Sequence, residues 1–456
     1  MAMELSFTVH RREAVLVGPS VSTPCETKRL SDIDDQESLR YHVPGLLVYR
    51  GGQPPAPCVR DNDPSGIIRA ALSRALVHYY PLAGRLREVE GRKLVIDCSG
   101  EGVVFVEADA DVRLEEMEAA AAGGHGLRPS FPCVDQLVPD VRSSGRGGSV
   151  LSCPLVGIQV TRLLCGGFIV GTAVNHSVCD AMGIVQFLNA VADIAGGLPA
   201  PAVHATWSRE LLDARSPPAP AFPHREYDMI DILPGGGREA DNIVRSFLFS
   251  STDIAALKEE ALLPHPEHRL RGGSSSTATS FEVLAAFLWR ARTAALEVPA
   301  DEEVRLVAVV GFSRIAALGL PSGYYGNTCA YPTVVMTAGE LLRGCTLGDV
   351  VRLVQEAKAA VTAEYVRSTA ECLVLRRRPR LARTNLFVVT DVRRVGFDRV
   401  DFGWGDPVYG GPARALPTVS LLVNVKGSSN VVGAVVSLPS LVMGRFSAEL
   451  ESFLNT

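Results

Sequence analysis

The chain contains no pair of cysteines in a C-x-x-C spacing. Its ten cysteines stand singly, from Cys25 to Cys372, in a sequence of 456 residues. Structural zinc sites and thiol redox centres are usually built on such paired spacings. We therefore predict neither a metal site nor a redox centre.

Long apolar runs and clustered basic charge are also missing. No stretch approaches the roughly 18–20 apolar residues of a membrane span, and the N-terminal segment lacks the apolar core of a secretion signal. The formal net charge is −5, whereas a nucleic-acid binder needs a clustered excess of Lys and Arg. We expect a soluble intracellular protein that binds neither membrane nor nucleic acid.

The cytoplasm is the expected compartment, with the peroxisome as the alternative. The C-terminal residues ESFLNT are not an S-K-L tail. Arg29-Leu30 together with Gln36 matches an internal peroxisomal signal only in part. Nothing in the sequence indicates an oligomer, and we take a monomer as the default.

Three common catalytic or cofactor motifs are absent. There is no G-x-S-x-G nucleophile elbow, no P-loop and no G-x-G-x-x-G fingerprint. An α/β-hydrolase serine therefore has no support. Cys179 stands three residues after His176 and is the one thiol nucleophile to consider. We expect helix entry to turn this thiol inward, away from the imidazole.

Length and composition favour a globular protein with two cores. A chain of 456 residues exceeds what one hydrophobic core normally supports, and 47% of the residues are hydrophobic. Residues 198–223 contain LPAPAVH and SPPAPAFP, and so many prolines suit a linker better than a core. We place the first domain at 1–197, a crossover segment at 198–223 and the second domain at 224–456.

Strand and helix patterns interleave along the chain, which predicts a mixed α/β fold. They lack the regular strand–helix alternation of a Rossmann sheet. The sequence TSFE at 279–282 is a capping box that opens a helix through Leu296. Apolar periodicity predicts one long amphipathic helix over about 347–370.

His176 is the strongest catalytic candidate. The segment GGFIVGTAVNH at 166–176 is an apolar strand that ends in this His, and a helix follows. A single His in apolar surroundings is more often structural than catalytic. Its neighbours Asn175 and Ser177 are small or polar, however, and a strand-to-helix junction can present a side chain to a cleft. There His176 could act as a general base on a hydroxyl or an amine.

Asp180, four residues later, has three readings. It can be the N-cap of the following helix, accepting from its first N–H groups. It can form an ion pair that fixes the loop carrying His176, or it can orient the imidazole as in a catalytic triad. We favour the cap combined with the ion pair, because an aspartate at the first turn also suits the helix dipole.

A second motif, DFGWG at 401–405, places two glycines around an aromatic residue. Glycines at this density indicate backbone torsions or close approaches that other residues forbid. We interpret Asp401, Gly403, Trp404 and Gly405 as a rigid turn with the indole packed inward. The motif would shape the site without acting in it.

Together the two motifs make the sequence resemble the plant BAHD family of acyl-CoA-dependent acyltransferases, which carry HxxxD and DFGWG. The resemblance covers essentially the whole chain. It includes YYPLAGRLRE at 79–88, TSFEVLAAFLWRAR at 279–292, GYYGN at 323–327 and DFGWGDPVYGGPA at 401–413. Within the family the sequence is most similar to the alcohol acyltransferases that include benzyl alcohol O-benzoyltransferases. Ala181 stands where the family often has glycine after the motif aspartate.

The resemblance implies a fold of two chloramphenicol-acetyltransferase-like domains. Each would be a mixed sheet flanked by helices, with a solvent channel between them. A segment at roughly 405–428 would cross back to complete the first sheet. CoA would enter the channel from one side and the acceptor from the other, and they would meet at His176.

The resemblance also assigns roles to residues. Asp180 would point away from the channel and pair with Arg314, and Asp401 would be structural. Thr390 matches a position credited with stabilising the oxyanion. The residues that contact CoA are not identified. The arginine-rich run at 376–380 is most simply a solvated turn, with contact to CoA phosphates as the lesser alternative.

The implied activity is acyl transfer from an acyl-CoA co-substrate to a small alcohol, with no permanently bound cofactor and no metal. The enzyme would be an acyltransferase for groups other than aminoacyl groups, and benzoyl-CoA with benzyl alcohol is the leading pair. Acetyl-CoA or hydroxycinnamoyl-CoA, and another alcohol or an amine acceptor, are the alternatives within the class. A non-catalytic binding protein of the same fold and a hydrolase are the alternatives outside it.

Overall fold

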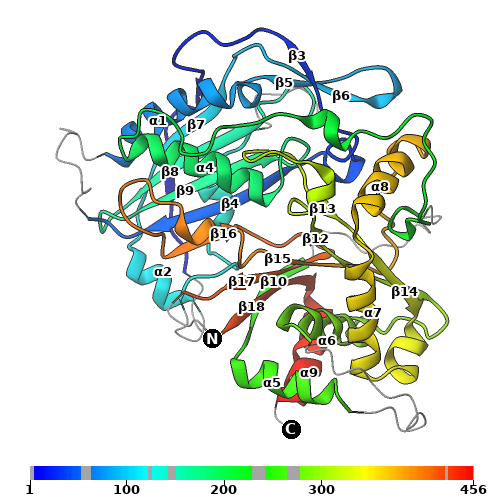
Figure 1. Cartoon of the computed structure of the whole chain (residues 1–456). Helices are drawn as coiled ribbons and strands as arrows, with labels where there is room; N and C mark the ends of the chain where they lie inside the picture. Colours follow the sequence, from blue (N-terminus) through cyan, green and yellow to red (C-terminus); the bar gives the residue numbers. More distant parts are fainter. Residues whose placement is uncertain are drawn as a thin grey trace.

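The computed structural model describes residues 5–52, 63–121, 126–141, 150–228, 242–263, 278–426 and 430–454. Two mixed sheets, each flanked by helices, form the two halves of the molecule (Figure 1). This architecture confirms the predicted fold class. No helix in the described ranges is long and apolar enough to span a membrane.

The first half is built on a sheet with the strand order β1-β7-β8-β9-β4-β16, and β2 also pairs with β7. All of its pairings are antiparallel except that of β7 with β8. Its strands are β1 (Val9–Arg11), β2 (Val15–Val17), β4 (His42–Tyr49), β7 (Val103–Ala110), β8 (Val156–Leu163), β9 (Phe168–Asn175) and β16 (Tyr409–Pro412). A small sheet of order β3-β6-β5 lies beside it, formed by β3 (Thr27–Arg29), β5 (Arg85–Glu88) and β6 (Leu94–Asp97).

Both faces of the first sheet are covered, which explains why its central strands are apolar throughout. Helices α1 (Pro64–His78) and α4 (Ala181–Ala195) pack against each other and share one core with residues of β7, β8 and β9. Helices α2 (Leu114–Ala120) and α3 (Val134–Leu137) share a second core with residues of β4 and β9. All eight residues of β9 are consequently buried.

The second half has a sheet of order β10-β18-β17-β15-β11-β14. Its strands are β10 (Asn242–Phe249), β11 (Glu303–Ala308), β14 (Thr333–Thr337), β15 (Leu386–Asp391), β17 (Val419–Asn424) and β18 (Val432–Pro439), and a separate two-stranded pair joins β12 (Val310–Gly311) to β13 (Cys329–Ala330). The helices are α5 (Ser251–Glu260), α6 (Ser280–Ala295), α7 (Leu347–Ala359), α8 (Ala363–Leu375) and α9 (Ser440–Leu454). Helices α5, α6, α7 and α9 share one core with this sheet.

Local sequence explains the helix boundaries, with one correction. The predicted capping box forms at α6: the Thr279 side chain accepts from the Glu282 N–H, and the Glu282 carboxylate accepts from the Thr279 N–H. The single helix predicted over 347–370 is wrong. It is divided into α7 and α8, because Thr362 is a second N-cap whose hydroxyl accepts from the Tyr365 N–H at 3.3 Å.

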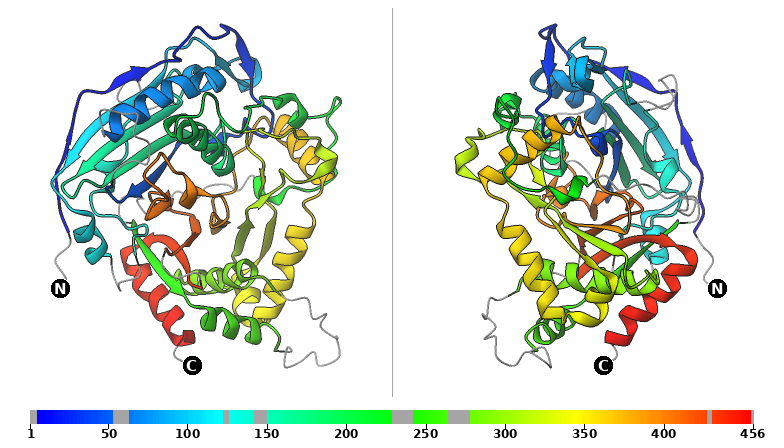
Figure 2. Two further views of the ribbon diagram at one scale, coloured as in Figure 1. Left: turned by 60° about the vertical axis from the view of Figure 1, so that its left-hand side comes forward. Right: turned by 90° about the vertical axis from the view of Figure 1, so that its right-hand side faces the viewer.

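The chain passes between the halves three times, once along 198–223 and then to β16 and back. Residues 198–223 lead from α4 to the second half and are held firmly: Arg209 and Leu212 are 1% and 2% exposed, and Thr206 bridges to Tyr324. Within 405–428, β16 pairs with β4 of the first sheet, whereas β17 belongs to the second (Figures 1 and 2). Only the short strand β16, drawn in orange, thus extends the first sheet.

A buried acidic segment at 31–36 ties the halves together. Asp32 and Asp35 are 7% and 0% exposed. Lys93 pairs with Asp32 at 2.6 Å, and the Arg378 guanidinium contacts Asp35 at 2.5 Å and Asp32 at 3.3 Å. Arg378 follows the C-terminal end of α8, so this network joins the second half to the first.

We predict that Arg378→Ala lowers the free energy of unfolding by about 3–5 kcal/mol, because it leaves buried carboxylates short of a cation. Arg377→Ala is the matched control. Arg377 and Arg378 both have positive φ, 55° and 58° respectively, but Arg377 is exposed. The control should change stability by less than about 0.5 kcal/mol. Urea unfolding measures both, and equal effects of the two variants would contradict the network's role.

Candidate active site

His176 lies where strand pairing ends and helix α4 has not yet begun. Its N–H donates to the carbonyl oxygen of Tyr41 at 2.8 Å, which continues the β4–β9 pairing by one residue. The Tyr41 ring lies against the imidazole, with ring centroids 5.5 Å apart. The strand behind His176 is fully buried, whereas His176 as a whole residue keeps partial solvent exposure.

Asp180 is the N-cap of α4 and does not orient the imidazole. Its Oδ1 accepts from the N–H groups of Met182 and Gly183 at 2.9 and 3.1 Å. Its Oδ2 accepts from the N–H and the hydroxyl of Thr328 at 2.8 and 2.9 Å. The carboxylate thus fixes the loop after β9 to the second half of the chain.

The ion pair expected between Asp180 and Arg314 is wrong. Arg314 is exposed in the segment after β12, and no ion pair of the described residues joins it to Asp180. The physical reason is that four uncharged donors already occupy both oxygens of the carboxylate. The capping part of the prediction agrees with the structure.

Asn327 is the side chain hydrogen-bonded to the imidazole, and sequence reasoning assigned it no role. Its Oδ1 lies 3.1 Å from His176 Nδ1. Its Nδ2 donates to the His176 carbonyl oxygen at 2.9 Å and to Asp34 Oδ1 at 2.8 Å. The two residues are 151 positions apart in the chain. The only signal was that Asn327 ends the GYYGN segment.

Electrostatics keep His176 neutral at pH 7. Burial lowers the pKa of the imidazole, because it disfavours the charged form more than the nearby Asn327, Asp180 and Asp34 favour it. A neutral imidazole has one protonated and one unprotonated nitrogen. Because Asn327 offers its amide oxygen to Nδ1, the proton lies there, and Nε2 is the basic nitrogen.

Cys179 is unsuited to be a nucleophile. The thiol is 1% exposed, and burial raises its pKa far above the ordinary value, with the Asp180 charge adding to the effect. The thiolate is the reactive form of cysteine. A buried neutral thiol does not supply it, as the sequence led us to expect.

Thr390 is the next-to-last residue of β15, where it pairs with Leu421 of β17. It is half-buried, and among the described residues its hydroxyl has no hydrogen-bond partner. A hydroxyl without an internal partner is available as a donor to a ligand. Its role at the oxyanion stays a prediction.

The DFGWG segment lies at the opposite end of β9 from His176. Trp404 packs edge-on against Phe168, the first residue of β9, with centroids 5.1 Å apart, and Phe402 packs against Tyr49 at 5.8 Å. His176 lies eight positions after Phe168, a span of about 25 Å along an extended strand. Asp401 is thus far from the imidazole.

Asp401 instead organises its own turn. Its Oδ1 accepts from the N–H groups of Gly403 and Gly405 at 2.7 and 2.8 Å. Both glycines have positive φ, 106° and 80°, which other residues rarely adopt. This geometry supports a structural role for the motif.

The arginine-rich run at 376–380 is engaged within the protein. Arg376 donates to the carbonyl oxygens of Tyr227 and Pro223, Arg378 pairs with Asp35 and Asp32, and Arg380 pairs with Glu37. The prediction of a solvated turn agrees with the exposed Arg376, Arg377 and Arg380 and is wrong for Arg378, which is buried in the carboxylate network. The carboxylate and carbonyl partners of Arg376, Arg378 and Arg380 also leave little reason to invoke CoA phosphates there.

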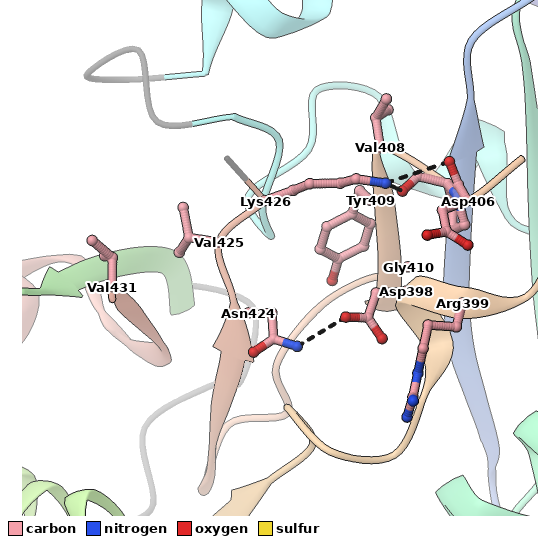
Figure 3. Close-up of a pocket in the computed structure, with 11 residues that line it drawn as sticks. Asp398, Arg399, Asp406, Val408, Tyr409, Gly410, Asn424, Val425, Lys426 and Val431 are labelled. Atoms are coloured by element: carbon pink, nitrogen blue, oxygen red, sulfur yellow. Dashed lines mark hydrogen bonds between the residues drawn. The ribbon is translucent and has the colours of Figure 1, made fainter. Parts of the chain in front are cut away.

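Two cavities lie near the hairpin that joins β17 to β18. The larger, about 610 Å³, lies between β16 of the first sheet and β17 of the second (Figure 3). Asp398, Arg399, Asn424 and Lys426 contribute to its lining, and the Lys426 ammonium donates to the Asp406 and Pro407 carbonyls. The smaller, about 310 Å³, is lined in part by Lys258, Ser280 and Arg393.

Four cations line these cavities and could hold a phosphate group there: Lys258 and Arg393 in the smaller one, and Arg399 and Lys426 in the larger one. Lys and Arg bind phosphate oxygens by charge-assisted hydrogen bonds. Arg393 is already paired with Asp391 at 2.6 Å, which reduces its free charge. No group of His, Cys, Asp and Glu in the described residues is arranged to hold a metal ion.

We predict that Asp401→Ala destabilises the fold by about 1 kcal/mol, because its turn loses a hydrogen-bond acceptor, and leaves turnover unchanged. Urea unfolding and steady-state kinetics measure the two effects. Asp401→Asn is the control, since the amide oxygen keeps the acceptor. A variant that folds normally but loses turnover would place Asp401 in the reaction and contradict its structural role.

Comparison with known proteins agrees with this geometry. The profile of the Transferase family matches residues 6–453. The benzyl alcohol O-benzoyltransferase of Petunia hybrida is 44% identical over alignments covering 99% of this chain and 95% of the relative, and that of Nicotiana tabacum is 43% identical with the same coverage. Alcohol acyl transferase 1, allele RGb, of Malus domestica is 42% identical, covering 97% of this chain and 94% of the relative.

Solved structures show the same fold at low identity. Vinorine synthase superposes with a TM-score of 0.69 at 20% identity, covering 98% of each chain. TRI101 of F. graminearum, complexed with coenzyme A and deoxynivalenol, gives a TM-score of 0.67 at 16% identity, covering 93% of this chain and 97% of that one. The family profile and the full-length relatives show that the chain belongs to the BAHD acyltransferases of the Transferase family, enzymes that transfer an acyl group from acyl-CoA.

Proposed function

We propose that this alcohol acyltransferase transfers a benzoyl group from benzoyl-CoA to benzyl alcohol and forms benzyl benzoate. The observation that carries the proposal is 44% and 43% identity over 99% of the chain to two benzyl alcohol O-benzoyltransferases. The Tyr41 ring beside His176 supports it, because an aromatic wall next to the base favours contact with a benzyl ring.

A second candidate is transfer of a short aliphatic acyl group to an aliphatic alcohol. Alcohol acyl transferase 1, allele RGb, of Malus domestica is nearly as similar, at 42% identity, and its name does not specify an aromatic substrate. Both candidates use the same chemistry at His176 and differ in the shape of the pocket. The substrates of the two candidates differ by one ring or a few methylene groups. A hydrophobic pocket discriminates between substrates by only about 1–3 kcal/mol for each methylene.

In the proposed mechanism His176 is the general base. Its Nε2 takes the proton of the alcohol, the oxygen attacks the thioester carbonyl, and a tetrahedral oxyanion forms. The Thr390 hydroxyl donates to that oxyanion, a contribution of about 2.7–4 kcal/mol in comparable sites. The oxyanion then collapses, the C–S bond breaks, and the imidazolium returns its proton to the leaving CoA thiolate. Acyl transfer is direct, without a covalent enzyme intermediate.

We predict that His176→Ala lowers kcat by at least about 100-fold while the protein stays folded. His204→Ala, the same change at an exposed site in the crossover segment, should keep the parent rate. Thiol release from benzoyl-CoA, hexanoyl-CoA and acetyl-CoA is measured with benzyl alcohol, hexanol or no alcohol. The highest kcat/KM is expected for benzoyl-CoA with benzyl alcohol.

The other outcomes of this assay contradict the proposal at separate points. A higher kcat/KM with hexanoyl-CoA and hexanol selects the aliphatic candidate. Thiol release that does not need alcohol indicates a hydrolase, and no release with any pair indicates a binding protein. Near-parent turnover of His176→Ala would remove the imidazole from the mechanism.

We also predict the pH dependence. His176 acts in its unprotonated form, and burial lowers its pKa below the ordinary value near 6.5. The acid limb of kcat/KM should therefore lie below pH 6.5, with transfer falling as pH drops through that limb. A pH–rate profile measures it, and a limb clearly above pH 6.5 would contradict a burial-lowered base.

A further inference from the structure

We propose that Asn327 is a positioning residue for His176, and that a buried ion pair between Asp34 and Arg209 of the crossover segment holds Asn327 in place. The inference rests on the proposed role of His176 as the base. It assigns a part in catalysis to three residues that lie outside both sequence motifs. The contacts run from Arg209 to Asp34, from Asp34 to Asn327, and from Asn327 to His176.

The orientation of the Asn327 amide follows from its partners. The two atoms that face Nδ2, the Asp34 carboxylate oxygen and the His176 carbonyl oxygen, can only accept hydrogen bonds. Rotating the amide by 180° would bring its oxygen against both acceptors. The amide oxygen must therefore face His176 Nδ1, where it is an acceptor at 3.1 Å. This contact selects the tautomer in which Nε2 is free to take a proton.

Asp34 is fully buried and gathers donors from three parts of the chain. Its Oδ1 accepts from the backbone N–H and the amide of Asn327 at 2.9 and 2.8 Å, and from Arg209 Nη1 at 2.9 Å. Its Oδ2 accepts from the Ser31 hydroxyl at 2.7 Å and from Arg209 Nη1 at 2.8 Å. A carboxylate with no water contact depends on such partners. Its position, and that of Asn327, is thus fixed.

Arg209 holds the same site from a second direction. It is 1% exposed, and its Nη2 donates at 2.7 Å to the carbonyl oxygen of Val178, which lies between His176 and Asp180. Its guanidinium lies over the rings of Trp207, Tyr324 and Tyr325, 4.5–5.2 Å from their centroids. One cation from the crossover segment therefore braces both the catalytic loop and the carboxylate that orients Asn327.

Close packing leaves this arrangement little freedom. A Cβ atom at position 326 would lie 1.7 Å from Arg209 Nη1, so only glycine fits between Tyr325 and Asn327. The turn that carries Asn327 is thus packed directly on the guanidinium. Loss of the Asn327 acceptor would leave the imidazole free to adopt either tautomer and to rotate, which lowers the fraction of enzyme poised for proton transfer.

The test compares Asn327→Ala with Thr328→Val. Both remove a buried polar group from adjacent positions, but the Thr328 hydroxyl contacts Asp180 and not the imidazole. We expect Asn327→Ala to lower kcat about 10–100-fold, as loss of an orienting partner typically does, with little change in KM. Its acid limb should move to lower pH, because the Asn327 hydrogen bond favours the protonated imidazole. Thr328→Val should leave the acid limb in place.

Asn327→Asp gives a rescue. Its carboxyl group would share a proton with Asp34, since two carboxylates at this distance do not both ionise. The shared proton replaces the Nδ2–H bond to Asp34, the bond to the His176 carbonyl is lost, and the other oxygen stays an acceptor for Nδ1. This variant should recover most of the turnover lost in Asn327→Ala, with an acid limb near that of the parent, because the carboxyl pair carries the same net charge as Asp34 alone. No recovery would contradict the acceptor role.

A double-mutant cycle tests the outer part of the arrangement. If Asp34 acts through Asn327, Asp34→Asn should slow turnover in the parent but not further in Asn327→Ala. Additive losses would overturn that part. The kinetics use the most active pair of the substrate panel, so a different substrate does not count against the inference. ¹⁵N NMR of His176 without substrate reports the tautomer directly, and a protonated Nε2 in the parent would overturn the proposal.

Discussion

The site depends on the hydrogen bonds and the ion pair that the buried carboxylate of Asp34 accepts. This carboxylate accepts hydrogen bonds from Ser31, from the crossover residue Arg209 and from Asn327 of the second half. Without folding of both halves these groups do not meet, so the imidazole of His176 is oriented only in the complete protein. Burial then does two things at once: it makes the arrangement rigid, and it lowers the pKa of His176 so that the imidazole is neutral when an alcohol arrives.

The two sequence motifs lie at opposite ends of strand β9. The loop after β9 carries His176, and Asp180 ties that loop to α4 and to Thr328. At the other end of β9, the DFGWG turn packs Trp404 against Phe168, beside the strand that extends the first sheet. The proposed base, His176, thus follows a strand that is buried on both faces and held by contacts at both ends. Such an arrangement suits a group that must stay within hydrogen-bond reach of its substrate.

What the sequence could predict was local. A strand leading to His176, a cap at Asp180 and the capping box at Thr279 are specified by neighbouring residues, and the structure contains them. The partners of these groups come from far along the chain, and local pattern carries no information on them. Asn327 lies 151 residues from His176, and the Arg314 pairing failed because backbone and hydroxyl donors had already filled the Asp180 carboxylate. The break between α7 and α8 was missed because periodicity continues through Thr362 while its hydroxyl caps a new helix.

A crystal structure with CoA and benzyl alcohol bound would test the central claim most directly, namely that internal contacts leave His176 Nε2 as the base. The account predicts the alcohol oxygen within about 2.6–3.2 Å of Nε2, with Nδ1 still on the Asn327 oxygen. An alcohol bound at Nδ1, or bound away from the imidazole altogether, would contradict it.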